Sequence, residues 1–68
     1  MKKFFLLRLE HNANYVLLEK EYRDKTHAIM DFNNLLHSTY RNVKLDEDGY
    51  CKPEGSNITF CVGETFSA

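Results

Sequence analysis

Three histidines are the residues of this chain best suited to proton transfer at neutral pH. His27 and Asp31 are four positions apart, a spacing that places an imidazole and a carboxylate side by side on a helix. Such a pair is usually a surface ion pair, and neither a His-Glu-x-x-His nor a Gly-x-Ser-x-Gly motif is present. We therefore predict no catalytic residues, and we expect a protein that is not an enzyme.

The acidic run Asp46-Glu47-Asp48-Gly49 is similar to part of a calcium-binding loop. Aligning Gly49 with the glycine of such a loop puts Lys44 and Gly55 where its first and last carboxylates are required. The three glycines are also too scattered to form a phosphate-binding loop. The run therefore predicts a hairpin turn, because Asp-Gly suits a positive φ, and we expect neither a metal nor another cofactor.

The two cysteines, Cys51 and Cys61, form no Cys-x-x-Cys motif and are too few for a disulfide-rich secreted protein. We predict two reduced thiols on neighbouring strands, both on the face away from the helix. The N-terminal run after Met1 imitates a secretory signal, but Arg8 interrupts it before the roughly 7–15 apolar residues that such a signal needs. We expect a soluble cytoplasmic chain that begins at Met1 and contacts no membrane.

Length and charge restrict the possibilities further. A chain of 68 residues, with 43% hydrophobic and 28% charged residues, fits a single globular domain over residues 1–68. Its formal net charge of -1 excludes a strongly basic nucleic-acid binder and an acidic DNA mimic. Local patches of either sign are still compatible with this balance.

Alternating apolar residues predict a hairpin at the N-terminus. Residues 3–10 and 15–22 both have the period of two that is typical of strands, and 11–14 form the turn, with asparagines that tolerate left-handed conformations. A four-residue turn pairs Leu9 with Val16 and Leu7 with Leu18. This register places the more uniformly apolar set of side chains, Phe5, Leu7 and Leu9, toward the core.

A helix and three short strands complete the predicted fold. Asp24 or Thr26 caps a helix from His27 to His37, and strands follow at 41–45, 50–52 and 58–62, separated by turns at 46–49 and 53–57. The fold class is α+β, in the order ββαβββ, with a curled antiparallel five-stranded sheet and one helix on its concave face. The predicted core is Phe5, Leu7, Leu9, Val16, Leu18, Ile29, Phe32, Leu36, Val43, Leu45, Ile58, Phe60 and Val62.

One helix covers only one face of such a sheet. The predicted register leaves Phe4, Leu6, Tyr15 and Leu17 on the other face, an unusual apolar patch for a small monomer. Two interpretations remain open. Either the sheet curls and the C-terminal tail around Phe66 covers the patch, or the patch is a contact surface for a partner or a second copy.

Basic and aromatic residues flank the end of the hairpin and both ends of the helix. They are suited to phosphates or to an acidic protein groove, or they form a solvated rim balanced by Glu19, Glu21 and Asp24. The candidate partner-binding residues are Tyr15, Lys20, Tyr22, Arg23, Lys25, Tyr40, Arg41 and Lys44.

The acidic Asp-Gly turn, the cysteine and the Glu-Gly turn within residues 46–55, followed by Asn57-Ile58-Thr59-Phe60, resemble small phage-encoded anti-CRISPR proteins that inhibit type I-F surveillance complexes. The layout also resembles a small phage inhibitor of host RNA polymerase. The first resemblance implies binding to the RNA-guided complex and obstruction of target DNA. In that group, basic residues of the helix support contact with the partner or with DNA. The helix predicted here contains no Lys or Arg.

We therefore expect a non-enzymatic phage inhibitor, acting in the host cytoplasm, that binds a CRISPR-Cas surveillance complex by protein–protein interaction. The alternative is a small nucleic-acid-binding or transcription-regulating module that uses the basic residues. Either protein is expected to be a monomer or a weak homodimer.

Overall fold

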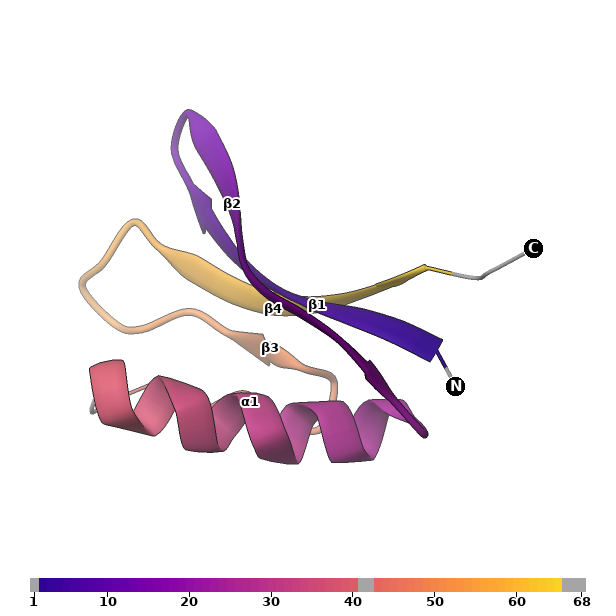
Figure 1. Cartoon of the computed structure of the whole chain (residues 1–68). Helices are drawn as coiled ribbons and strands as arrows, with labels where there is room; N and C mark the ends of the chain where they lie inside the picture. The colour runs from indigo at the N-terminus through magenta and orange to yellow at the C-terminus, as the bar shows by residue number, and fades with distance from the viewer. Residues whose placement is uncertain (1, 41–42, 66–68) are drawn as a thin grey trace.

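The computed structural model describes residues 2–40 and 43–65, which form a four-stranded antiparallel sheet with one helix against one face (Figure 1). The elements are β1 (Lys2–Glu10), β2 (Ala13–Tyr22), α1 (Lys25–Thr39), β3 (Tyr50–Cys51) and β4 (Thr59–Thr65). Their order across the sheet is β2-β1-β4-β3, so β1 lies at its centre. The α+β class is confirmed. The predicted curled five-stranded sheet is wrong, because residues 43–45 are not a strand.

The first hairpin is present, but with a different register. Glu10 pairs with Ala13, so the turn contains only His11 and Asn12, and no described residue other than glycine has a positive φ. Leu7 pairs with Val16, whereas Leu6 pairs with Leu18, so Leu17 is an additional residue in β2 and forms a β-bulge. The predicted pairings of Leu9 with Val16 and Leu7 with Leu18 are therefore wrong.

The structure also inverts the predicted faces of β1. Phe4 and Leu6 are buried against the helix, whereas Phe5, Leu7 and Leu9 lie on the opposite face and are only partly covered. Val16, predicted for the core, is exposed. Alternation alone could not separate the two faces, because both carry large apolar side chains; the prediction chose the set without Arg8.

Arg8 explains why the helix side tolerates a charge. Its guanidinium lies 3.0 Å from Glu10 through Nε, donates to the Tyr40 hydroxyl at 3.2 Å, and stacks 4.7 Å from the ring centre of Tyr15. The hydrogen bond to Tyr40 also raises the pKa of Arg8. The charge is thus paired with Glu10 at the margin of the core, although the buried Nε makes no hydrogen bond of good geometry.

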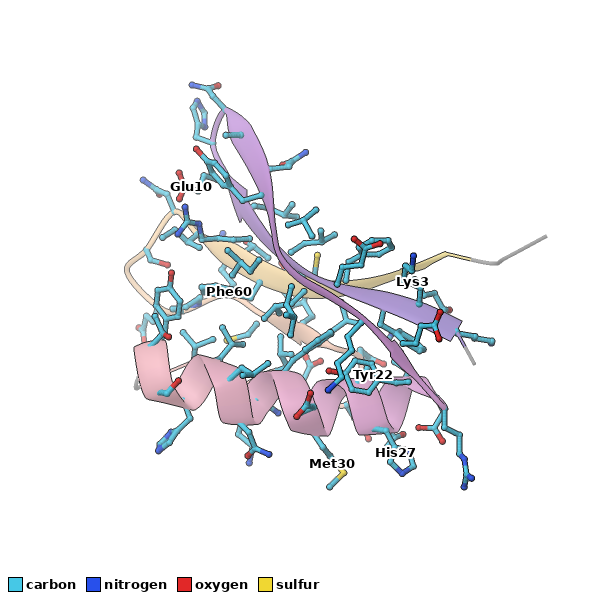
Figure 2. All side chains as sticks on the ribbon, viewed as in Figure 1. Lys3, Glu10, Tyr22, His27, Met30 and Phe60 are labelled. Atoms are coloured by element: carbon cyan, nitrogen blue, oxygen red, sulfur yellow. The ribbon has the colours of Figure 1, made fainter. Side chains whose placement is uncertain are left out.

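Of the two predicted caps, Asp24 begins the helix, by accepting a hydrogen bond from the backbone N–H of His27 at 2.9 Å. The helix is longer than the predicted 27–37 and buries Ala28, Ile29, Phe32 and Leu36. His27 does not pair with Asp31; its Nδ1 lies 2.7 Å from the Asp24 carboxylate. His27 and Met30 point away from the sheet (Figure 2).

The segment after the helix packs without forming a strand. Val43 and Leu45 are buried as predicted. Asn33 of α1 holds this segment by binding both backbone groups of Leu45. The Leu45 N–H donates to Asn33 Oδ1 at 2.7 Å, and Asn33 Nδ2 donates to the Leu45 carbonyl at 3.4 Å. A side chain thus replaces the sheet partner that a strand would have had.

Both predicted turns are present. Gly49 has φ 77 and donates its N–H to the Asp46 carbonyl at 2.9 Å, while the Asp46 side chain accepts from the N–H groups of Asp48 and Tyr50. A Cβ at Gly49 would also lie 3.0 Å from Val62 Cβ, so the close packing of this turn favours glycine. The second turn has Gly55 at φ 78.

Most of the predicted core lies between the helix and the sheet, where Figure 2 shows Phe60 pointing toward α1. Ile29, Phe32, Leu36, Val43, Leu45 and Phe60 are buried, and Leu18, Ile58 and Val62 pack against them. Three rings, those of Phe4, Phe32 and Phe60, are at most 1% exposed.

Candidate partner-binding surface

The face of the sheet opposite α1 is apolar. The register places large side chains from all four strands on it, and we call this surface the distal face. Val16 is 58% and Tyr50 is 49% exposed, while the remaining members are partly buried. The distal face consists of Phe5, Leu7, Leu9, Val16, Tyr50 and Cys61.

A glycine in β4 allows an apolar side chain of β1 to pack closely on that strand at the distal face. Gly63 lies opposite Phe5, and a Cβ on Gly63 would be 3.3 Å from Leu7 Cδ1, so the Leu7 side chain lies over the backbone of β4. The polar border includes Lys3, whose Nζ is 3.3 Å from Glu19 Oε1. Apolar side chains bordered by charged ones are typical of surfaces that contact other molecules.

The prediction of an exposed apolar sheet face is therefore right about the feature and wrong about its residues. Phe4 and Leu6 are in the core, and Leu17 and Tyr15 lie on the helix side. The predicted covering by Phe66 falls on a residue outside the described part of the chain, so that interpretation is not tested.

The structure distributes the eight predicted binding residues over several sites. Tyr15 and Tyr40 both contact Arg8, and the Tyr40 ring packs on Phe60 with their centres 5.1 Å apart. Tyr40 also ends the helix, since its N–H donates to the Leu36 carbonyl. Tyr40 thus has a structural role, whereas Tyr15 keeps 43% of its surface exposed.

Tyr22 and Lys20 form a second group, on the helix side of β2. The Tyr22 hydroxyl donates to the Asp31 carboxylate, and its ring packs edge-on against Phe32 with their centres 5.3 Å apart. Desolvation and the bond to Asp31 raise the pKa of Tyr22, so its phenol stays protonated. Lys20 Nζ lies 3.9 Å from Asp31 and 5.6 Å from the Tyr22 ring centre.

The remaining basic residues do not join this group. Arg23 and Lys25 are exposed in the β2–α1 connection and the first turn of the helix, and Lys44 is exposed between the buried Val43 and Leu45. Arg41 lies outside the described residues. Acidic side chains lie beside two of the basic candidates, since Asp31 is near Lys20 and Asp24 is near Arg23.

Other candidate chemistry is sparse in the described chain. Within residues 2–40 and 43–65, no three His, Cys, Asp or Glu side chains are grouped closely enough to hold a metal ion. None of the helical segments described is long and apolar enough to cross a membrane.

The two cysteines are free and occupy neighbouring strands, as predicted, but not one face. Cys51 pairs with Phe60 and packs against the core, whereas Cys61 pairs with Leu7 and Tyr50 on the distal face. Partial burial raises the pKa of the Cys61 thiol. The parity argument failed because Tyr50, not Cys51, lies opposite Cys61.

The sequence did contain a signal for the correct face. Gly63 shares its parity with Cys61 and Thr59, the β4 residues opposite Leu7 and Leu9. A glycine and a threonine fill a helix–sheet core poorly, whereas Phe60 and Val62 fill it well. Pairing β1 with β4 by side-chain size would therefore have assigned Phe5, Leu7 and Leu9 to the distal face.

Comparison of this chain with protein-family models, with curated proteins and with solved structures finds no match in any of the three.

Proposed function

We propose that this chain is a small non-enzymatic inhibitor that binds a host CRISPR-Cas surveillance complex through the distal face and thereby obstructs target DNA. The observation that carries the binding role is the apolar surface around Leu7, on which Val16 and Tyr50 are exposed. The choice of partner is supported by the turn pattern of residues 46–60, which resembles type I-F anti-CRISPR proteins. The proposed setting is the host cytoplasm.

A protein contact is favoured over a nucleic-acid contact by the charges. The distal face contributes apolar area and few cations, whereas Lys20, a candidate phosphate ligand, lies beside Asp31. Binding through apolar area should depend weakly on salt, whereas a phosphate binder loses affinity steeply as salt rises. A salt titration of complex formation therefore separates the two functions.

The test adds the purified chain to a type I-F surveillance complex and measures target DNA binding and co-elution. We expect inhibition by the natural chain, loss of inhibition by Val16→Glu, and full inhibition by Met30→Glu. The two substituted side chains are similarly exposed, at 58% and 62%. Val16 is paired with Leu7 on the distal face, whereas Met30 points away from the sheet (Figure 2). DNA binding that is unaffected at large molar excess, without co-elution, would contradict the proposed partner. Equal inhibition by both variants would contradict the distal face as the contact.

A further inference from the structure

A second surface lies on the other side of the sheet, between β2 and the C-terminal half of α1. Here a cleft of about 300 Å³ opens, with Leu17 38% and Leu35 44% exposed at its mouth. Ser38 and Thr39 provide polar groups at its border. The lining residues are Leu6, Leu17, Leu18, Leu35, Leu36, Ser38, Thr39 and Tyr40.

The β-bulge accounts for this cleft. The additional residue in β2 interrupts the regular pairing at Leu6 and Leu7, and a bulge bends its strand and increases the local twist. In Figure 1, β2 lies close to the start of α1 and diverges from the helix toward the hairpin turn. Leu17 and Leu18 thus line the space between the diverging strand and Leu35.

The cleft borders an open sheet edge. β2 is an outer strand of ten residues, and within residues 2–40 and 43–65 no strand pairs with its other side. The backbone N–H and C=O groups on that side are able to pair with an added strand. A strand added to β2 would direct alternate side chains to the helix side, over the mouth of the cleft.

Charge on the same strand indicates which segment fits. Glu19 and Glu21 lie on the distal side of β2, and Lys3 is opposite Glu21 and within 3.3 Å of Glu19. On the distal side of this part of the edge two carboxylates therefore lie near one lysine, whereas Lys20 points to the helix side, beside Asp31. A symmetric pairing of β2 with a second copy centred on Lys20 would place Glu19 opposite Glu21, which disfavours that arrangement.

We propose that the β2 edge and the adjacent cleft bind an extended partner segment in which apolar and basic side chains alternate. The segment pairs its backbone with β2, directs its apolar side chains over Leu17 and Leu35, and directs its basic side chains toward Glu19 and Glu21. This site does not depend on the proposed function, because it uses neither the distal apolar residues nor an identified partner.

The test titrates the full chain with a fluorescent synthetic peptide in which leucine and lysine alternate. We expect saturable binding that slows amide hydrogen exchange at alternate residues of β2, because outward-facing N–H groups then become hydrogen-bonded. Leu35→Glu should weaken binding roughly tenfold or more, since it places a charge in an apolar contact. Tyr50→Glu, a similarly exposed position on the distal face, should bind like the natural chain.

Further experiments test the role of the two carboxylates and whether a peptide or a second copy of the chain binds in the cleft. Glu19→Gln combined with Glu21→Gln should weaken binding and flatten its salt dependence, and a peptide with glutamate in place of lysine should not bind. Circular dichroism establishes that each variant is folded. Unchanged exchange in β2, or equal binding by the Leu35→Glu and Tyr50→Glu variants, would overturn the proposal. So would a concentration-dependent dimer that Leu35→Glu abolishes, because a second copy would then occupy the cleft.

Discussion

The two faces of the sheet carry similar apolar side chains, but other elements of the chain cover those of one face much more than those of the other. On the helix side, Phe4 and Phe60 are enclosed by α1 and by the segment from Val43 to Leu45. On the distal face, Phe5 and Leu7 pair within the sheet, no described helix lies over them, and they remain partly exposed. One helix can cover one face, so the same alternation produces a core on one side and an available surface on the other.

The largest expected effect on stability compares the same substitution, phenylalanine to alanine, on the two sides of the sheet. Phe32→Ala should lower the free energy of unfolding by about 3–5 kcal/mol, because it empties a fully buried site. Phe5→Ala should cost only about 1 kcal/mol, a typical value for a partly exposed position. Urea unfolding of both variants measures the difference. Equal losses would contradict the conclusion that the distal face is not part of the core.

The next effect concerns how the helix side is completed without a fifth strand. Asn33→Ala removes both contacts to the backbone of Leu45 and should destabilise the fold by about 1–3 kcal/mol, because a partly buried N–H loses its acceptor. The neighbouring Asn34→Ala is the matched control, since Asn34 is exposed. Chemical denaturation of the pair tests the role of this side chain. If Asn34→Ala lost as much stability as Asn33→Ala, the loss would come from a change in helix propensity and not from the contacts to Leu45.

These comparisons show how far the sequence could predict the structure. The hairpin, the cap at Asp24, the helix and both glycine turns follow from local rules that need no knowledge of tertiary contacts. The fifth strand was wrong because Asn33, distant in sequence, satisfies the backbone of Leu45.

The candidate surface was harder to predict because it depends on a single bulge and on the pairing of β1 with β4. An additional residue at Leu17 reverses the parity of β2 relative to β1, so every side chain beyond it changes face. Arg8 then biased the choice of face, because its partners Tyr15 and Tyr40 are brought near only by the fold. Lys20 and Tyr22 were predicted as partner-binding residues, and the sequence did not indicate that both interact with Asp31. Tyr22 is partly buried, whereas Lys20 remains exposed.

A smaller effect tests the start of the helix that creates the covered face. Hydrogen bonds from the backbone N–H and the ring of His27 lower the pKa of Asp24 below its ordinary value of 3.8. The contribution of this cap is therefore fully present above that value, and it is lost as pH falls through the lowered folded-state pKa. Asp24→Asn keeps a capping oxygen without the charge, so its stability should fall less on acidification. Thermal melts of both proteins from neutral to acidic pH measure this difference. An equal loss of stability in both proteins would contradict this role.

The smallest effect uses the thiols as reporters, because they lie on opposite faces of the sheet. Both cysteines should alkylate in denaturant without prior reduction, since neither is in a disulfide. In the folded chain Cys61 should react slowly, because burial raises its thiol pKa and the thiolate is the reacting form. Leu7 lies directly opposite Cys61, so Leu7→Ala should accelerate alkylation of Cys61 and leave Cys51, on the helix side, unchanged. Mass spectrometry of digested, time-quenched samples resolves the two sites. If Leu7→Ala accelerated both thiols equally, the substitution would have loosened the whole sheet, and the distal face could not be treated as a surface separate from the core.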